Sequence, residues 1–509
     1  MTYTPLKHII FIPGPPWGHL RPGLKTALRM TEKFQDLFIS LFVYSTEMSK
    51  ATKYLNAQPS VYSRRIRLVT ATSNEGDPAM SPGNEIEMIN SLQNAFKLWM
   101  TSETQQPTII QLDGQPINAP SLIMEDIFGG GAALACKDVH QLPIVAWWLM
   151  SAASLMSVVG GRNDDENLDI SETMVQNGAE AKNILAKGGE NSSQDSSNKL
   201  ICIPGIPPFY EWEAATQDLP FMGPIMGYLL ERFKNMFKHA DTVVCGTTFE
   251  YEPITASAVS SAFKITPFFI GPSVDLTSPH QPDPESPVTQ FLDRAYTEQG
   301  AHSVIYIAFG TFFFPPPSSM SLLMAAMDEI PKAGFKFIFA RSSERAQLDQ
   351  AWMDMHVQAG NAIFPEWTNQ TAVLEHPAMH YFLSHGGWNS CTEAIVRGIP
   401  MIFWPIMGDQ PLDAMQIANV HDCGFELLQV RTGPAQSVAY QNGTDVKIVG
   451  TEDAVREEMR RIIALSKGPR GEHQRANMRL LGKVVADSLG SGGSGDMGLE
   501  RFGKGLGLV

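Results

Sequence analysis

The sequence predicts an α/β protein made of two Rossmann-like domains that face each other across a cleft. Three observations favour this fold. Strand, turn and helix patterns alternate along the chain, a segment rich in proline and acidic residues interrupts them at residues 277–287, and 509 residues exceed the size of one ordinary domain. In folds of this kind ligands bind beside the carboxyl ends of the strands, so we expect the functional site in the cleft.

The first half, residues 1–275, opens with the strand-turn-helix unit of a doubly wound sheet. The run HIIFIP at residues 8–13 predicts a buried strand, GPPWGH a turn, and LRPGLKTALRMTEKF at residues 20–34 a helix. Apolar runs predict further strands at residues 38–44, 120–126, 142–148 and 241–247. Residues 160–200 are acidic and rich in Asn and Ser, which predicts a loop, and their NDDEN run indicates a solvated charge cluster rather than a metal site.

A linker at residues 276–287 separates the two halves, because proline, serine and acidic residues concentrate there. The alternation resumes over residues 288–484, with strands predicted at 303–311, 335–341, 381–384 and 400–405 and a helix at 320–330. We expect the last helix, at about residues 485–509, to pack back onto the first half.

The composition argues against several kinds of partner. A net charge of −15 disfavours nucleic acid and anionic membranes, because surfaces that track phosphates need a basic excess. The five cysteines are scattered and lack CxxC spacing, so we expect no disulfide framework, no metal site and a reducing, cytoplasmic setting. The uncharged stretch at residues 143–161 is interpreted as a strand that turns into a helix, so no transmembrane anchor is expected.

Chemistry-bearing side chains concentrate between Trp367 and Gln410. There the strand YFLS leads into the turn HGGWNS, which opens a helix, so two adjacent glycines let the backbone approach a ligand while free N–H groups attract an anion. This arrangement is typical of a diphosphate site. The alternative is a simple capping box made by Ser390 and Glu393, in which Glu393 folds back and cannot also grip a sugar.

This run resembles the signature box of the plant secondary-product, UDP-sugar-dependent family-one glycosyltransferases. The resemblance implies the GT-B fold, with an acceptor-binding first half and a UDP-sugar-binding second half. It assigns Trp367, Gln370 and Glu393 to uracil and ribose; His385, Gly387, Asn389 and Ser390 to the diphosphate turn; and Trp388, Asp409 and Gln410 to the hexose. Gly386 stands where plant members usually have cysteine, which we expect only to loosen the turn.

Two shorter segments resemble further donor contacts of this family. Gly310 and Thr311, in AFGT, are similar to its phenylalanine-glycine-serine turn, whose hydroxyl meets the phosphates, although a plain strand-end turn explains them equally well. Ser151, in LMSAAS, aligns with a hydroxyl residue that contacts the hexose, although serine is common after a strand.

A catalytic base has to come from the first half, because the donor residues alone only bind. His19 is the candidate, since a helix N-terminus favours a neutral imidazole and a carboxylate partner would fix its tautomer. Asp126 is the matching partner, with Glu125 as its rival because neighbours on a strand point to opposite faces. GPPWGH, which contains Gly18, and DIF resemble the family's glycine-histidine turn and aspartate-x-phenylalanine segment, and this resemblance favours Asp126. Without the box, His19 would be interpreted as an ordinary loop residue.

The function implied is inverting transfer of a hexose from a UDP-sugar to a hydroxyl of a lipophilic small molecule, with no cofactor and no metal. A terminal glutamine accompanies glucose donors in this family, so Gln410 indicates UDP-glucose. The many Met and Phe residues suit an adaptable apolar acceptor pocket. One alternative is a non-catalytic nucleotide-sugar-binding subunit. Another is a dehydrogenase, which the lack of GxGxxG after the first strand disfavours.

Overall fold

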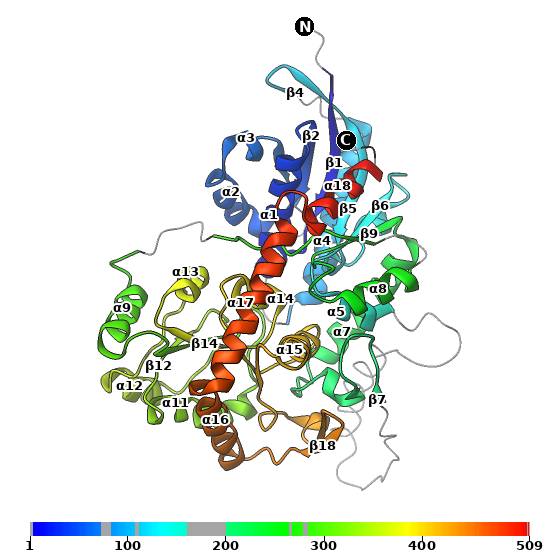
Figure 1. The fold of residues 1–509 in the computed structure, drawn as a ribbon. Helices are drawn as coiled ribbons and strands as arrows, with labels where there is room; N and C mark the ends of the chain where they lie inside the picture. The colour runs from blue at the N-terminus through cyan, green and yellow to red at the C-terminus, as the bar shows by residue number, and fades with distance from the viewer. Residues whose placement is uncertain are drawn as a thin grey trace.

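A computed structural model describes residues 4–72, 83–106, 111–159, 200–263, 267–277, 283–505 and 507. Two parallel sheets dominate it, one in each half of the chain, and helices cover them (Figure 1). The segment predicted as a loop at residues 160–200 falls almost wholly outside the described residues, as do residues 278–282 of the predicted linker.

The first sheet has the strand order β10-β9-β6-β5-β1-β2-β3, and β4 pairs antiparallel with β5 at its edge. Its strands are β1 (Leu6–Ile12), β2 (Leu37–Phe42), β3 (Ile66–Val69), β4 (Gln111–Leu112), β5 (Gln115–Asp126), β6 (Ile144–Trp148), β9 (Thr242–Cys245) and β10 (Pro267–Phe269). The helices of this half are α1 (Trp17–Lys33), α2 (Met48–Asn56), α3 (Ser60–Ser63), α4 (Glu85–Gln105), α5 (Ala152–Val159), α7 (Met222–His239) and α8 (Pro253–Ala262).

The second sheet has the order β13-β12-β11-β14-β15-β16. Its strands are β11 (Val304–Ala308), β12 (Lys336–Ala340), β13 (Ala362–Ile363), β14 (Met379–Ser384), β15 (Met401–Phe403) and β16 (Gly424–Glu426). The helices are α9 (Pro287–Gln299), α10 (Met320–Met327), α11 (Glu329–Lys332), α12 (Gln350–Gln358), α13 (Gln370–Glu375), α14 (Trp388–Val396), α15 (Gln410–Ala414), α16 (Glu452–Lys467), α17 (Pro469–Leu489) and α18 (Ser494–Gly505). Two hairpins, β7-β8 (Leu200–Ile201 with Phe209–Tyr210) and β17-β18 (Val438–Gln441 with Thr444–Lys447), lie outside both sheets.

The central strands coincide with the apolar runs of the sequence. β1, β2, β5, β6 and β9 of the first sheet, and β11, β12, β14 and β15 of the second, all overlap predicted strands, although β5 begins at Gln115, five residues before the predicted start. Nearly all their residues in the middle of each sheet are buried, because helices cover both faces of a parallel sheet and leave no room for alternating polar residues. The strands that the sequence did not predict, such as β3, β13 and β16, are two to four residues long and lie at sheet edges.

The chain returns to the first half at its end. α17 packs against α14 and α16 of the second half, and α18 packs against β10 of the first sheet (Figure 1). The expected final helix is therefore broken, since α17 ends at Leu489 and α18 begins at Ser494. Phe502 is fully buried, and its ring contacts that of Phe268 at a centroid distance of 5.6 Å.

A row of four basic side chains, spaced four residues apart, follows one side of α1. Each contacts a different part of the molecule: Arg21 pairs with Glu393 of α14, Lys25 with Asp275 after β10, Arg29 donates to the Ile270 carbonyl, and Lys33 pairs with Asp496 of α18. Residues four apart on a helix lie on the same side, so one helix contacts the second half, the residue just before the linker and the final helix at once.

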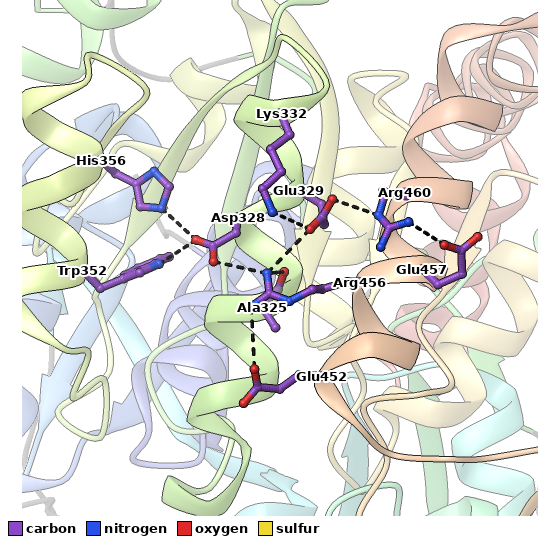
Figure 2. Close-up of polar contacts among 10 residues, drawn as sticks. All are labelled: Ala325, Asp328, Glu329, Lys332, Trp352, His356, Glu452, Arg456, Glu457 and Arg460. Carbon is purple, nitrogen blue, oxygen red and sulfur yellow. Dashed lines mark hydrogen bonds and ion pairs between the residues drawn. The ribbon is translucent and has the colours of Figure 1, made fainter.

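Helices on the second sheet are joined by a polar network at the junction of α10 and α11 (Figure 2). Asp328 accepts hydrogen bonds from Trp352 Nε1 of α12 at 2.9 Å and from Arg456 Nη1 of α16 at 3.3 Å. The neighbouring Glu329 is almost fully buried and accepts from Arg460 of α16 at 3.1 Å. This network fixes α12 and α16 relative to the sheet from which the candidate site is built. Among the residues that the structure describes, no helix is both long and apolar enough to cross a membrane.

Candidate active site

His19 and Asp126 meet at the carboxyl end of the first sheet. β1 ends at Ile12 and α1 begins at Trp17, which places His19 in the first turn of the helix, while Asp126 is the last residue of the neighbouring strand β5. The Nδ1 atom of His19 lies 2.8 Å from Oδ2 of Asp126. Asp126 is fully buried and also accepts hydrogen bonds from the backbone amides of Gly14 (3.0 Å) and Phe128 (2.9 Å). The carboxylate is thus fixed by two amides and holds the imidazole by its Nδ1 edge.

Strand alternation separates Asp126 from its rival. The carboxylate of Glu125 points to the opposite face, where it accepts hydrogen bonds from the backbone amides of Ala132 and Ala133 at 2.5 and 3.0 Å. Burial raises the pKa of Glu125 to about 7. Of the two carboxylates considered from the sequence, Asp126 is the one that contacts His19.

The turn between β14 and α14 is built on glycine. Gly386 has a φ of +87°, a left-handed conformation that glycine adopts at low cost, and a Cβ on Gly387 would lie 2.5 Å from the His385 ring. Gly386, which stands where plant members usually have cysteine, therefore does more than loosen the turn, because glycine readily adopts the backbone conformation found there. His385 is buried, and burial lowers its pKa to about 4, so the ring is neutral near pH 7.

The capping-box alternative is wrong. Gly387, not Ser390, is the N-cap of α14, and no side chain caps the helix. The Ser390 hydroxyl accepts from Gln370 Nε2 at 3.3 Å, and Glu393 lies a full turn inside the helix. The backbone N–H groups of the first turn of α14 are thus not used by the side chains that the capping box requires. Trp388 N donates instead to Asp409 Oδ2 at 3.3 Å.

Glu393 is 2% exposed and has a different partner on each oxygen. Arg21 Nη2 donates to Oε1 at 2.5 Å, and Gln370 Nε2 donates to Oε2 at 2.8 Å. Burial alone would raise the pKa of Glu393, but the charges of Arg21 and Lys25 and these hydrogen bonds bring it below its usual value. Glu393 is therefore a buried, ionised carboxylate. The buried Tyr306, which sequence reasoning missed, donates to Gln370 Oε1 at 3.3 Å and so orients its amide.

A second group of carboxyls lies at the start of α15. Asp409 and Asp413 are four residues apart, and burial raises the pKa of both, that of Asp413 far above its usual value. The nearby His19 opposes this rise at Asp409. Gln410 is buried, and its Oε1 accepts from the amide of Ile406 at 2.9 Å. This bond leaves the Nε2 end of the Gln410 side chain to face away from the 406–407 turn.

Ser151 and Asp413 join the two halves beneath this group. The Ser151 hydroxyl donates to Asp413 Oδ1 at 2.7 Å, and Ser151 is fully buried. Its hydroxyl is thus directed at a carboxyl rather than open to a ligand. Asp413 was missed by sequence reasoning, although its spacing from Asp409 on one helix face was a usable signal.

Residues of the run between Trp367 and Gln410 also contact the first half directly. Asn389 Nδ2 donates to the Gly18 carbonyl at 2.6 Å, and Trp388 Nε1 donates to the Gly246 carbonyl at 3.0 Å. The structure therefore brings the residues of α14 and α15 together with the first turn of α1. Two predicted residues are exposed rather than buried: the Trp367 side chain is 63% exposed, and Thr311 is exposed in the turn after β11. Gly310, with a φ of +73°, faces the His385 ring, which a Cβ would meet at 3.0 Å.

Comparison with known proteins agrees with this architecture. The family model described as UDP-glucoronosyl and UDP-glucosyl transferase matches residues 227–435. Anthocyanidin 3-O-glucosyltransferase 7 of Manihot esculenta is 30% identical over 264 residues, covering 51% of this chain and 88% of that protein. UDP-glycosyltransferase eriJ of Hericium erinaceus is 24% identical over 501 residues, covering 93% of each chain.

Solved structures share the fold over nearly the whole chain. Medicago truncatula UGT71G1 complexed with UDP-glucose superposes with a TM-score of 0.67 at 19% identity, covering 98% of both chains. TcCGT1 in complex with UDP gives a TM-score of 0.69 at 19% identity, covering 99% of both. The GT-B fold and the resemblance inferred from the run between Trp367 and Gln410 are both confirmed. This chain belongs to the UDP-glycosyltransferase family, and it is an enzyme that transfers a sugar from a UDP-sugar to small-molecule acceptors.

Proposed function

We propose that the enzyme transfers glucose from UDP-glucose to a hydroxyl of a lipophilic small molecule, with inversion at the anomeric carbon and with His19 as the general base. The observation that carries this proposal is the 2.8 Å contact between His19 Nδ1 and the buried Asp126. The Nδ1–H group donates a hydrogen bond to the carboxylate and keeps its proton. Nε2 is then the unprotonated, basic atom of the ring.

The reaction is a single displacement. Nε2 of His19 takes the proton of the acceptor hydroxyl, the hydroxyl oxygen forms a bond to the anomeric carbon, and the bond from that carbon to the β-phosphate oxygen breaks. Because the acceptor attacks from the face opposite the leaving UDP, the configuration inverts. Asp126 stabilises the imidazolium that forms, as the carboxylate of a catalytic triad does.

The donor is held by the residues that meet around α14. In this proposal Trp367 stacks on uracil through its exposed ring, and Glu393 accepts the two ribose hydroxyls beside Gln370. The diphosphate lies at the N-terminus of α14, where backbone amides attract an anion. The other diphosphate residues are Gly310, Thr311, His385, Gly387, Asn389 and Ser390, and Gly18 supports Asn389 through its carbonyl. With these donors for the leaving group, we expect turnover to persist in the presence of EDTA.

The hexose lies beside α15. Asp409 accepts from sugar hydroxyls and Gln410 donates through Nε2, because its Oε1 is already taken by the 406–407 turn. Trp388 borders the same space, and Ser151 contributes indirectly by fixing Asp413. Glucose is favoured by the terminal position of Gln410 in the box and by relatives named as glucosyltransferases.

The two halves divide the substrates between them. We propose that residues 1–275 bind the acceptor, that 288–484 bind UDP-glucose, and that 276–287 link them. Relatives named for anthocyanidins and flavonoids favour a flat, apolar acceptor with a hydroxyl, such as a phenol.

The test is turnover by the purified chain with UDP-glucose and a panel of hydroxylated aglycones. Wild-type protein should release UDP and form a β-glucoside from the α-linked donor, which NMR of the product identifies. His19→Ala should lose about a hundredfold or more in kcat while UDP still binds. Near-native turnover by His19→Ala would show that the base has been assigned wrongly, and an α-linked product would exclude single displacement.

A further inference from the structure

Arg21 is the first member of the basic row on α1 and lies two residues after His19. Its guanidinium crosses from the first half to the second, where Nη2 contacts Glu393 Oε1 at 2.5 Å. About 29% of the Arg21 side chain is exposed, whereas 2% of Glu393 is. The reaction proposed above gives Arg21 no part.

We infer that Arg21 is a positioning residue for the donor, supplied by the acceptor-binding half, which holds the Glu393 carboxylate in the orientation that binds the ribose of UDP-glucose. The inference rests on the proposed function, in which Glu393 accepts the two ribose hydroxyls. Its ligand is the nucleoside diphosphate part of the donor, and its specificity is for ribose over deoxyribose.

The Glu393 carboxylate has enough acceptor positions for its protein partners and for a ligand. A carboxylate has two oxygens and about four lone-pair positions. Arg21 occupies one position on Oε1 and Gln370 one on Oε2, so each oxygen keeps a position for a ribose hydroxyl. The two protein donors and the two hydroxyls can therefore bind at once.

The buried Glu393 carboxylate also needs a partner of opposite charge. A carboxylate buried as deeply as Glu393 is costly unless a cation pairs with it, and UDP brings further negative charge to the same region. Within the described residues, Arg21 is the cation that hydrogen-bonds the Glu393 carboxylate, and the charge of Lys25, one turn further along α1, acts on it in the same direction. The positive charge of Arg21 offsets the negative charge of Glu393, and its hydrogen bond does not occupy the positions that the ribose hydroxyls need. The site can therefore hold both the anionic UDP and the Glu393 carboxylate.

The ion pair between Arg21 and Glu393 joins the two halves of the chain. Arg21 belongs to α1 and Glu393 to α14, so the ion pair forms only where the halves meet. Asn389 of the same helix makes its own contact with the first turn of α1, at the Gly18 carbonyl. The ribose subsite is therefore completed by the helix that carries the base.

The experiment measures the preference of each variant for UDP over 2′-deoxy-UDP by calorimetry, together with KM and kcat for UDP-glucose. The variants are Arg21→Met, Arg21→Lys and Glu393→Gln. The matched control is Lys33→Met, at the far end of the same row on α1, whose partner is Asp496 of α18. Because the preference is a ratio taken on one preparation, a reduced folded fraction does not change it.

In Arg21→Met we expect UDP to bind about tenfold more weakly, with a much smaller change for 2′-deoxy-UDP. The KM for UDP-glucose should rise more than kcat falls. Arg21→Lys should recover most of the preference because it keeps the charge, and Lys33→Met should keep the wild-type preference.

Two outcomes separate this inference from the function on which it rests. If Glu393→Gln abolishes the preference for ribose while Arg21→Met retains it, the role of Arg21 is refuted and the donor assignment stands. If Glu393→Gln itself leaves the preference intact, Glu393 does not read the ribose and both proposals about this subsite fall.

Discussion

At the scale of single residues, the candidate site depends on which way neighbouring carboxyls point. Glu125 and Asp126 are adjacent on β5, yet one binds two backbone amides and the other holds His19. Two adjacent carboxyl groups therefore have different roles. Glu125 stabilises the fold on one face of the sheet, and Asp126, in our proposal, takes part in catalysis on the other.

Replacing Asp126 by Asn should lower kcat about a hundredfold or more, because an amide can no longer fix the Nδ1–H tautomer or stabilise the imidazolium. UDP affinity should change little, since Asp126 does not contact the donor residues. Steady-state kinetics with UDP-glucose and calorimetry with UDP provide the two measurements. Glu125→Gln is the matched control, and it should keep its turnover per folded molecule. Equal losses in both variants would mean that folding, not the base, is affected.

Asp409 and Asp413 should also differ in their tolerance of Asn. Burial and the neighbouring Asp409 raise the pKa of Asp413 far above its usual value, which favours the neutral carboxyl, and a neutral amide resembles that form. Asp413→Asn should therefore keep the KM for UDP-glucose close to wild type. Asp409→Asn should raise that KM about tenfold while the Kd for UDP, which lacks the hexose, stays unchanged. A raised Kd for UDP in Asp409→Asn would place Asp409 elsewhere than at the sugar.

At the scale of elements, the first backbone amides of α5 donate hydrogen bonds to a buried carboxyl group from a distant segment. Glu252, just before α8, accepts from the amides of Ala152 and Ala153 at 2.7 and 2.9 Å and from Thr247 at 2.6 Å. It thereby satisfies N–H groups at the start of α5 that the helix itself cannot pair. Burial raises the pKa of Glu252 from 4.5 to about 7.

This shift gives the fold a pH dependence of definite sign. The folded state holds the Glu252 proton more tightly than the unfolded state, so the stability it contributes is fully present below about pH 4.5 and is lost as the pH rises through 7. The free energy of unfolding should thus fall between pH 5 and 8, and Glu252→Gln should flatten part of that fall. Denaturant titrations at constant ionic strength measure it. A Glu252→Gln slope equal to that of the wild type would contradict the prediction.

The sequence predicted the fold better than it predicted the site's partners. Central strands such as β1 and β14 are continuous apolar runs, so burial on both faces is written in their composition, whereas β13 and β16 are too short to carry a period. Within the site, the residues of α14 are close in sequence and were recognisable together. The contacts Arg21 with Glu393 and Ser151 with Asp413 join positions far apart, and no local spacing encodes which side chains face each other across an interface.

At the scale of the whole molecule, the two halves are joined by more than the linker. α17 crosses from the second half to the first, and α18 lies directly on β10, where a Cβ on Gly498 would come within 2.0 Å of the Phe269 carbonyl oxygen. Leu499 and Phe502 of α18 are buried against the first half. The first half is therefore completed by residues that follow the second in sequence.

Removal of residues 491–509 should destabilise the first half by about 3–6 kcal/mol, since two large apolar side chains lose their burial. Denaturant unfolding followed by tryptophan fluorescence measures this change. Asp496→Asn, which removes the charge that pairs with Lys33 but keeps an oxygen that can accept from the Gly492 amide, should cost about 1 kcal/mol or less. A truncated chain as stable as the full one would show that α18 is not part of the folding unit.

The basic row on α1 bears on how hybrid enzymes of this kind should be made. A single crossover at the linker would join α1 from one parent to Glu393 and Asp496 from another, and so split two ion pairs between two ancestries. A cassette that replaces only residues 288–489 would keep α1 and α18 from the same parent. The incoming cassette then has to bring a carboxylate to the position of Glu393. Recombination for new donor preference should therefore preserve the match between Arg21 and Glu393 as well as the other contacts between the halves.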